Sequence, residues 1–375
     1  TYPSFTRMNI SMACNHCDDP VCLKGCPTRA YTKHPEYGAV IQDPDICFGC
    51  GYCTWVCPYN APQLDPVAGR VEKCNMCVDR LEVGLKPACV AACLGNALDF
   101  GVIESTPENR VQAKTRIPGF PDPSITHPNI RFQQIKSLPR DLTRTDCAPI
   151  KYHRDGTDAP YRPMAELKTG ARKRWSLSKL SSRENPLVIF TLTTQAVIGA
   201  FILLFLGPQL GLKGLGAPGL ALPALFVLIG LQTFVLWLST QHLGKPLRFY
   251  RGFNNLRHSP LSREALGIGL FLGLMGAQAG SLLFEPFLGP ALSGILAEAT
   301  GWAAMASGLA GLYFMQRIYR IEARPFWDHW QVSTSFFGTM ASLGGVLAAF
   351  LGLPFLVLSG LDFAPTTMQI PGKGQ

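Results

Sequence analysis

The stretch that decides the N-terminal fold reads Cys47-Phe48-Gly49-Cys50-Gly51-Tyr52-Cys53-Thr54-Trp55-Val56-Cys57-Pro58. Its spacing, C-x2-C-x2-C-x3-C-P, is the bacterial ferredoxin run, in which three closely spaced thiolates bind one [4Fe–4S] cluster. In proteins with two clusters, the fourth cysteine of the run ligates the other cluster. The stretch therefore predicts a ferredoxin-like α+β iron–sulfur domain and requires a partner run elsewhere in the chain.

A partner run precedes it, as Cys14-x2-Cys17-x4-Cys22-x3-Cys26-Pro27. Exchanging the fourth cysteines of the two runs gives two complete sets of ligands. One set is Cys14, Cys17, Cys22 and Cys57, and the other is Cys47, Cys50, Cys53 and Cys26. We therefore predict two complete [4Fe–4S] clusters in this chain.

A third cysteine group has no partner group. It consists of Cys74, Cys77, Cys89 and Cys93, and Leu94 stands where the other runs have proline. Because such groups work in pairs, we expect a fourth group upstream of Thr1, which would give up to four clusters. The alternative is that the third group binds zinc or one incomplete cluster. The remaining cysteine, Cys147, is predicted to be a free thiol.

Zinc and disulfide bonds are the general alternatives for cysteines at this density. Zinc sites prefer two CxxC pairs separated by a longer loop, and they do not need a CxxCxxCxxxCP run. Cysteines this close in sequence seldom have the geometry to form disulfides with one another. The spacing favours iron–sulfur clusters over both.

The second half of the chain is apolar. Five uncharged runs cover about residues 187–207, 220–240, 265–284, 299–316 and 334–361. A helix needs about 20 residues to cross the hydrocarbon core of a bilayer. Buried helices of a soluble protein are the alternative, but five such runs in succession argue against it. We predict an all-α polytopic transmembrane bundle of about five helices.

The predicted domains are thus an iron–sulfur domain (residues 1–105), an extended proline-rich arm or linker (106–185) and a membrane anchor (186–365). The net charge of +9 is concentrated beside the apolar runs, which favours a membrane over nucleic acid as the partner. Two loops on the side of the cysteine domain hold Lys245, Arg248, Arg251, Arg257, Arg263, Arg317, Arg320 and Arg324. The opposite loops hold only Lys213. By the positive-inside rule, the cysteine domain should face the cytoplasm at a bacterial inner membrane.

These motifs resemble the dimethyl sulfoxide reductase family. Cys14-Asn15-His16-Cys17-Asp18-Asp19-Pro20, Cys57-Pro58-Tyr59 and Lys86-Pro87-Ala88-Cys89 are similar to its iron–sulfur subunit. His242-Leu243-Gly244-Lys245-Pro246 and Leu261-Ser262-Arg263-Glu264 are similar to its anchor subunit. The resemblance covers about residues 8–105 and 187–350. Members of the family usually have four cysteine groups and eight spans, whereas this chain shows three groups and five runs.

The resemblance implies an electron-transfer and anchor subunit that does not itself bind the substrate. It would connect a separate molybdopterin catalytic subunit with membrane quinone, either menaquinone or ubiquinone. His242 and Glu264 lie at the ends of consecutive apolar runs, and ionisable groups at such positions are usually functional. We expect them to bind quinone and to carry its protons. A helix cap for His242 and a helix N-terminal carboxylate for Glu264 are the structural alternatives.

Three other functions use the same parts. The same wiring could run in reverse in a quinone-reducing dehydrogenase, for example one that oxidises sulfite. A membrane-bound metal or redox sensor would need no catalytic partner. An ion pump would need interior charges for a proton path, and the apolar runs offer few of them.

Overall fold

The computed structural model describes residues 13–101, 113–114, 120–133, 150–153, 162–165, 185–212, 215 and 219–358. Cys147 and most of the predicted arm lie outside these residues. The chain divides into two compact units, which are described separately. Unit 1 comprises Thr1–Asn185, Thr240–Ser262 and Arg317–His329, and unit 2 comprises Pro186–Ser239, Arg263–Gln316 and Trp330–Gln375. Unit 1 thus includes two connections between long helices, residues 240–262 and 317–329, which we call the anchor loops.

Unit 1 contains the same small motif twice, each time as a cysteine loop, a short helix and a hairpin. The first copy consists of α1 (Val21–Gly25), β1 (Tyr31–Lys33) and β2 (Val40–Gln42). The second consists of α2 (Tyr52–Val56), β3 (Gln63–Asp65) and β4 (Arg70–Glu72). Both hairpins are antiparallel, with Thr32 opposite Ile41 and Leu64 opposite Val71.

A Cys-Pro pair ends each short helix. Cys26 and Cys57 leave the helical conformation with ψ of 117° and 118°, although their N–H groups still donate to Cys22 O and Cys53 O. Proline disfavours a helical conformation in the residue before it and cannot donate an N–H itself, so each helix stops at its cysteine. The last cysteine of each run is therefore turned away from its own helix.

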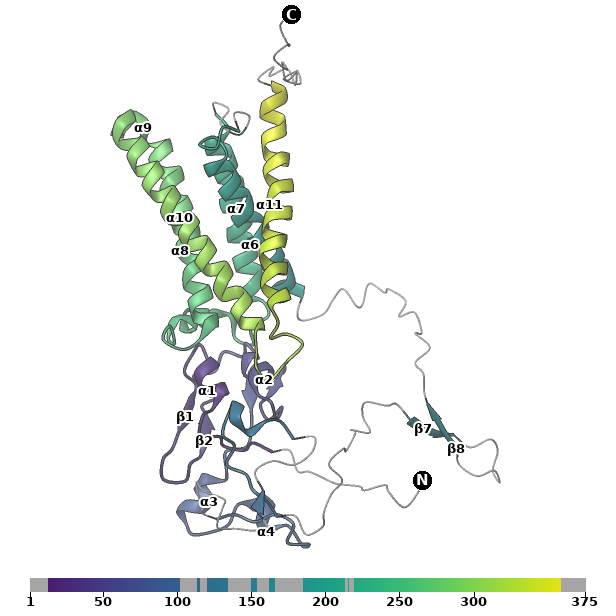
Figure 1. Ribbon diagram of the computed structural model, residues 1–375. Helices are drawn as coiled ribbons and strands as arrows, with labels where there is room; N and C mark the ends of the chain where they lie inside the picture. Colours follow the sequence, from purple (N-terminus) through teal and green to yellow (C-terminus); the bar gives the residue numbers. More distant parts are fainter. Residues whose placement is uncertain are drawn as a thin grey trace, which may run out of the picture. The chain divides into compact units, whose positions relative to one another are not determined.

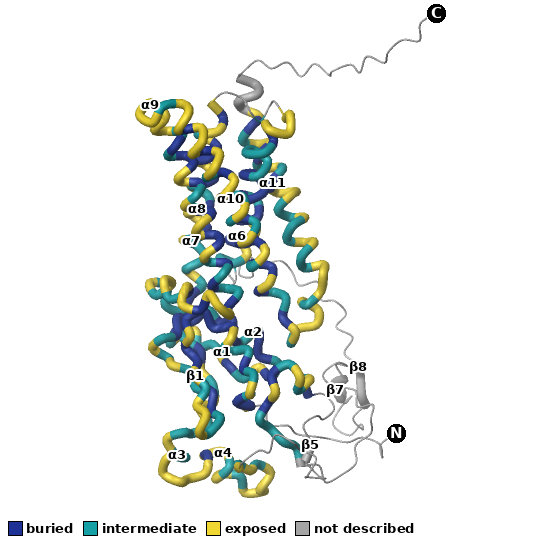
Figure 2. Tube along the Cα trace, turned by 60° about the vertical axis from the view of Figure 1, so that its left-hand side comes forward, coloured by how far each residue is buried: buried dark blue, intermediate teal, exposed yellow. Residues whose placement is uncertain are grey.

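The remaining elements of unit 1 are short. Two helices carry the third cysteine group, α3 (Val78–Glu82) and α4 (Ala88–Ala91). The described parts of the arm hold β5 (Ala113–Lys114), η3 (Pro123–Ile125), β6 (Phe132–Gln133), β7 (Ile150–His153) and β8 (Arg162–Ala165). The first anchor loop contains η6 (Pro246–Phe253). Figure 2 shows that the α3–α4 segment is mostly exposed, whereas the chain around α1 and α2 has many buried residues.

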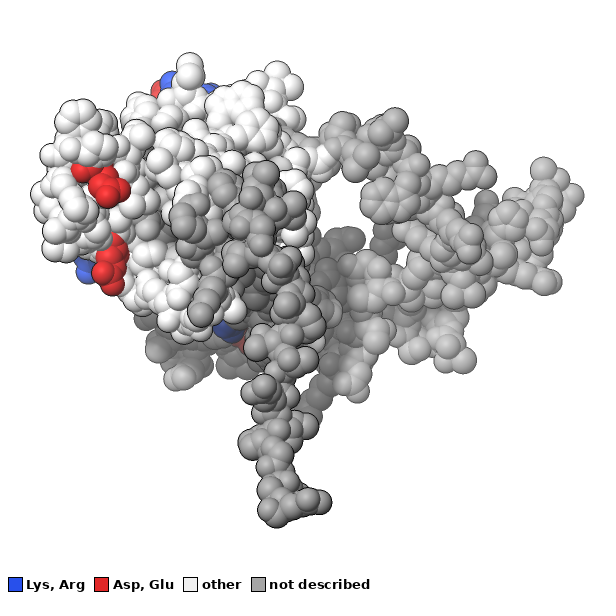
Figure 3. All heavy atoms as spheres, turned by 90° about the horizontal axis from the view of Figure 1, so that it is seen from above, with Lys and Arg blue, Asp and Glu red and all other residues white. Residues whose placement is uncertain are grey.

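Unit 2 is a bundle of long helices that run side by side (Figure 1). They are α6 (Asn185–Leu206), α7 (Ala221–Thr240), α8 (Pro260–Leu283), α10 (Pro290–Tyr319) and α11 (Trp330–Leu358), with the short α9 (Glu285–Leu288) between α8 and α10. Apolar side chains such as Phe201, Phe271 and Met275 fill its core. Of its described residues, only Arg263, Glu264, Glu285 and Glu298 are charged. Figure 3, which views the molecule from above, shows described atoms that are mostly uncharged, with a few acidic and basic side chains at the edges.

Glycines let pairs of these helices approach closely. A Cβ added at Gly267 would lie 2.8 Å from Gly311 Cα, and one added at Gly199 would lie 2.9 Å from Gly344 Cα. Small residues at such crossings are typical of helices that pack in lipid, where van der Waals contact replaces the hydrophobic effect. A polar contact also joins two of these helices. Buried Gln232 of α7 donates from Nε2 to Thr194 Oγ1 of α6 at 3.0 Å.

The structure confirms the predicted helical C-terminal region and changes one detail of it. Within the described residues, four helices are long and apolar enough to span a membrane: α6, α7, α8 and α11 up to Leu353. The fifth predicted run lies in α10, which is 30 residues long but is not among the four. It is richer in alanine, glycine and serine than in large apolar residues, and it also contains Glu298 and Arg317.

Candidate iron–sulfur site

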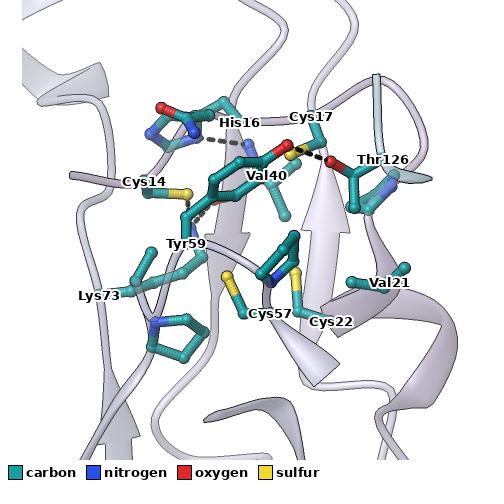
Figure 4. A pocket seen from close by; sticks show the side chains of 15 residues that line it. Cys14, His16, Cys17, Val21, Cys22, Val40, Cys57, Tyr59, Lys73 and Thr126 are labelled. Carbon is teal, nitrogen blue, oxygen red and sulfur yellow. Dashed lines mark hydrogen bonds between the residues drawn. The ribbon is translucent and has the colours of Figure 1, made fainter. Parts of the chain in front are cut away.

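Four cysteines from separate parts of unit 1 line one cavity. Cys14 and Cys17 come from the loop before α1, Cys22 from α1 itself and Cys57 from the end of α2 (Figure 4). This is the first of the two sets that the crossed pairing predicts. Because Pro58 ends α2 at Cys57, the Cys57 thiol can reach across to the other run.

The second predicted set, Cys26, Cys47, Cys50 and Cys53, also gathers. Burial, together with the neighbouring Cys26 and Cys47, raises the pKa of Cys50 to about 12. Burial also raises the pKa of Cys53, which has Cys50, Cys26 and Cys47 as charged neighbours. Thiols in apolar surroundings ionise only with difficulty, and bound iron would compensate for the cost of their negative charge.

The two sets are adjacent. Burial raises the pKa of Cys22 well above its usual value, and both Cys14 of its own set and Cys53 of the other set raise it further. Burial raises the pKa of the Cys74 thiol, and the nearby Cys14 and Cys89 raise it as well. The cysteines therefore form a series, from the third group through the first set to the second.

The thiols suit a cluster better than a single ion. Within the described part of the chain, no three His, Cys, Asp or Glu side chains are placed to bind one metal ion. A [4Fe–4S] cluster makes a different demand, since each of its four thiolates binds its own iron. Backbone N–H groups point at several sulfurs, at 3.4 Å for Ala30 to Cys26, 3.3 Å for Met76 to Cys74 and 3.2 Å for Ala97 to Cys93. Such donors stabilise thiolates bound to iron.

The third group is the most open. Cys74 and Cys89 are exposed, and Cys77 and Cys93 are half-buried. Hydrogen bonds from the backbone of Leu98 and Ala97 lower the pKa of the Cys93 thiol. Large apolar side chains beside this group also face solvent, including Leu94 and Val83.

His16 and Lys73 adjoin the first set. His16 is buried, and its Nδ1 accepts a hydrogen bond from Val40 N at 3.0 Å. Burial and the charge of Lys73 lower the pKa of His16 to about 3, so the ring is neutral at physiological pH. Lys73 Nζ donates to Val40 O and lies 3.6 Å from Cys14 Sγ. Lys73 was not among the site residues predicted from the sequence, where its position immediately before Cys74 is the one feature that points to it.

A described segment of the arm, residues 120–133, covers the first set. Its backbone carbonyls at Thr126 and His127 accept from Asp19 N at 3.0 Å and Asp18 N at 2.8 Å. The side chain of Thr126 is fully buried and lines the cavity. No spacing in the sequence indicates this contact, because more than 100 residues separate Thr126 from Cys17 along the chain.

The anchor loops bind the backbone of the two cysteine runs. Lys245 N donates to Phe48 O at 3.0 Å, and the guanidinium groups of Arg248 and Arg251 both donate to Asp45 O at 2.6 Å. Further along the loop, Asn255 Nδ2 donates to Cys26 O at 2.8 Å. Lys245, Arg248 and Arg251, which the sequence presented as orientation signals, therefore also hold the loop that carries Cys47 and Cys50.

The second anchor loop contacts α2. Trp55 packs against Tyr319 and Trp327, with ring centroids 6.2 and 6.0 Å apart, and Arg324 Nε donates to Trp55 O at 3.4 Å. Tyr52, next to Cys53, donates to Ile318 O at 3.4 Å. Aromatic and apolar contacts of this kind make the loop part of the core of unit 1.

Three glycines make the contact with the first anchor loop possible. Gly49 and Gly69 have positive φ, 74° and 62°, and a Cβ at Gly244 would lie 2.5 Å from Gly69 Cα. Since only backbone meets backbone there, a side chain could not move aside. Gly244 is thus required for close approach to the run that contains Cys47 and Cys50.

Gly244→Ala is expected to loosen this contact, at a cost of about 1–3 kcal/mol as for other overpacked sites. Limited proteolysis of membranes should then cut the anchor loop faster than in the wild type. Gly252→Ala is the matched control, because a Cβ there would meet nothing within 4 Å. Equal cleavage rates for the two variants would show that the glycine contact is dispensable.

The two predicted quinone residues fall in different units and are described separately. His242 is half-buried and follows the end of α7 in the first anchor loop. Glu264 lies in the second turn of α8 and is only 6% exposed. Among the described residues, no hydrogen bond or ion pair is seen at its carboxyl group.

Comparisons with known families give one match over the predicted iron–sulfur domain and another over the predicted membrane anchor. Residues 6–103 match the model of the 4Fe-4S dicluster domain, and residues 180–364 match that of the DMSO reductase anchor subunit (DmsC). The protein is 44% identical over 121 residues to one chain of the anaerobic dimethyl sulfoxide reductase of Escherichia coli K12, covering 32% of this protein and 58% of that relative. It is 36% identical over 160 residues to one subunit of the sulfite dehydrogenase of Allochromatium vinosum, covering 39% of this protein and 66% of that relative.

A third relative is the iron–sulfur subunit of formate dehydrogenase-O of Escherichia coli K12, at 44% identity over 107 residues, which cover 28% of this chain and 36% of that protein. The chain therefore spans about three fifths of the dimethyl sulfoxide reductase chain that it resembles. The predicted resemblance is confirmed for both halves. The chain joins an iron–sulfur domain of the 4Fe-4S dicluster family to a membrane domain of the dimethyl sulfoxide reductase anchor family.

Proposed function

We propose that this protein carries electrons between membrane quinone and a separate catalytic subunit through [4Fe–4S] clusters. The observation that carries the proposal is the binding of the anchor loops to the cysteine runs within unit 1. Lys245, Arg248 and Arg251 hold the backbone beside Cys47, and Asn255 holds that of Cys26. The first anchor loop, which contains these residues, joins α7 to α8 in sequence, and the second joins α10 to α11. The segments that contact the cysteine runs are therefore continuous in sequence with the long helices.

The cysteine series gives the route. Electrons that enter beside the anchor loops would reach the cluster of Cys26, Cys47, Cys50 and Cys53 first. They would pass next to the cluster of Cys14, Cys17, Cys22 and Cys57, and then to the third group. The clusters supply the electron transfer when bound, while the protein sets their spacing and potentials.

We propose that His242 of unit 1 and Glu264 of unit 2 each take part in quinone binding and proton transfer. Oxidation of a quinol releases two electrons and two protons, so the site needs both a route to the clusters and groups that accept protons. His242 belongs to the loop that contacts the second set, and a histidine can accept or release a proton near neutral pH. Glu264 is a buried carboxyl within a candidate membrane span, which in such helices usually marks a functional position.

The exposed third group indicates where the partner binds. Cys74, Cys89, Leu94 and Val83 face solvent at the end of the cysteine series that is opposite the anchor loops. We propose that a molybdopterin catalytic subunit covers this surface. We also propose that the iron–sulfur domain lies on the cytoplasmic face, as the basic anchor loops favour.

The direction of electron flow has two candidates. Similarity to the dimethyl sulfoxide reductase chain favours quinol-linked reduction, whereas the longer match with the sulfite dehydrogenase subunit favours sulfite oxidation with quinone as acceptor. Assays on the purified complex with quinol plus dimethyl sulfoxide, and with sulfite plus quinone, separate the two. Activity in only one pair identifies the direction.

Iron analysis tests the central proposal. Protein purified without oxygen should contain at least about eight irons and eight sulfides per chain, because two complete sets of four thiolates each hold a cluster of four irons. Zinc should be absent in stoichiometric amounts. Stoichiometric zinc without iron would refute the electron-transfer function as a whole.

A further inference from the structure

A buried pair of hydroxyl groups adjoins the first cysteine set. Tyr59 follows the Cys57-Pro58 pair, and Thr126 comes from the arm segment that covers the cavity. Their hydroxyl oxygens are 2.7 Å apart, and both residues are buried, at 2% and 0% exposure. Figure 4 shows the pair joined by a dashed line, with the Cys17 sulfur beside it.

The surroundings hold both groups in place. The Tyr59 ring stacks on Phe120 with centroids 5.2 Å apart, and Phe120 packs edge-on against Phe132 at 4.9 Å. The Thr126 backbone is fixed by the hydrogen bond from Asp19 N. Neither hydroxyl can reach solvent, so each must find its partners within this cluster of residues.

The donors and acceptors allow one order. Cys17 and Thr126 line the same cavity, and the Cys17 sulfur lies beside the Thr126 hydroxyl, which is therefore placed to form a hydrogen bond with it. A thiolate bound to iron has no proton to give and can only accept. Thr126 must therefore donate its one proton to Cys17, and its oxygen then accepts the proton of Tyr59. We call the resulting series, from the Tyr59 hydroxyl through the Thr126 hydroxyl to Cys17 Sγ, the hydroxyl relay.

We propose that the hydroxyl relay raises the reduction potential of the cluster held by Cys14, Cys17, Cys22 and Cys57. Reduction adds one electron to the cluster and moves no proton. A hydrogen bond to a ligating sulfur stabilises the more negative, reduced form more than the oxidised form, and hydrogen bonds to the sulfurs are among the factors that set cluster potentials. Tyr59 strengthens the effect, because hydrogen bonds in a series polarise one another.

The second set has a simpler counterpart. Thr28 is also buried, and its hydroxyl lies 3.4 Å from Cys26 Sγ without an intermediate group. Thr28 and Tyr59 occupy the same place after their Cys-Pro pairs. The first cluster thus has a hydroxyl donor that comes from the arm, whereas the hydroxyl groups beside the second set, those of Thr28 and Tyr31, come from its own part of the chain, which lets the two potentials differ although their cysteine runs are alike.

Redox titration of the assembled membrane protein, followed by electron paramagnetic resonance, tests the relay. Thr126→Val removes the hydroxyl and keeps the shape. We expect it to lower the equilibrium constant for reduction of the first cluster about tenfold. For a one-electron step this lowers the reduction potential by about 59 mV. Tyr59→Phe should cause a smaller shift in the same direction, and Thr126→Ser should restore the wild-type potential. Thr28→Val should shift only the second cluster, and Thr32→Val, at an exposed strand position, should shift neither.

The relay rests on the proposed ligation by these cysteines, and the outcomes separate the two ideas. Absence of iron from the wild type refutes the ligation. Wild-type iron and signals with an unchanged potential in both Thr126→Val and Tyr59→Phe overturn the relay alone, as does a shift confined to the second cluster. If Thr126→Val loses its cluster, Tyr59→Phe decides, since its ring can still stack on Phe120, and an unchanged potential in it overturns the relay.

Discussion

Quinol-linked turnover is expected to fall by about 10²–10⁴-fold in His242→Ala, the usual effect of losing a positioned acid or base. Each turnover at the proposed site releases two protons, and without the imidazole these would have to leave to water directly. Cluster content and membrane insertion should not change. Stopped-flow measurement of cluster reduction by quinol gives the rate of this step by itself.

Two controls make the His242 result specific. His258→Ala removes an exposed histidine from the same anchor loop and should leave turnover unchanged. Reduced dye, which delivers electrons to the clusters without passing through the quinone site, should support normal turnover in His242→Ala. A structural role would instead show as lower protein abundance with normal activity per molecule.

Glu264→Gln tests the second half of the site. The amide has nearly the same shape as the carboxyl but cannot carry a proton, so we expect slow quinol oxidation with little loss of quinol binding. Glu285→Gln, at an exposed position in α9, is the matched control. Normal quinol kinetics in both Glu264→Gln and His242→Ala would remove the quinone site from this position without touching the proposed electron path.

Cys57→Ser is expected to abolish the cluster of Cys14, Cys17 and Cys22, with a loss of about four irons per chain. In sequence, Cys57 stands beside Cys53, so a ligand assignment by proximity along the chain would predict damage to the other cluster. The structure has Cys57 lining the cavity of the first set, because Pro58 ends α2 there. The Cys26→Ser variant is the reciprocal control and should remove the second cluster.

Electron paramagnetic resonance of the reduced single variants distinguishes the two clusters. Neighbouring reduced clusters broaden each other's signals, so each variant should lose one signal together with the broadening that the missing cluster caused. The signals that survive in Cys57→Ser should match those in Cys14→Ser and differ from those in Cys47→Ser, and a match with Cys47→Ser instead would contradict crossed ligation.

Cysteine spacing predicted much of the iron–sulfur fold, because the ligands of a cluster and the prolines that end α1 and α2 are local features. Hydropathy likewise predicted the long helices, because lipid imposes a simple demand on composition. α10 is long enough for a span but is not among the four helices that are also apolar enough, so its crossing of the membrane stays a prediction. Its small residues pack well against other helices, but they add little hydropathy.

Contacts between distant segments could not be predicted in this way. Thr126 lies in a proline-rich stretch without periodicity, and its role depends on where the backbone returns. Lys245, Arg248 and Arg251 fitted a general rule about membrane orientation. Only the fold shows that their N–H groups donate to carbonyls of the Cys47 loop. Gly244 gave no signal by itself, because its importance comes from the close approach of its backbone to that of Gly69, the residue before β4.

The discontinuity of unit 1 has a consequence for how the protein is made. The hydrogen bond from Tyr52 to Ile318 joins residues 266 positions apart, and the anchor loops that complete the unit are separated by two long helices. A nascent polypeptide cannot finish this unit until residue 329 has left the ribosome, after most of the helices have been offered to the membrane. Insertion of the helices and completion of the iron–sulfur unit are therefore parts of one assembly event, and a polypeptide released early would leave cysteines exposed to oxidation.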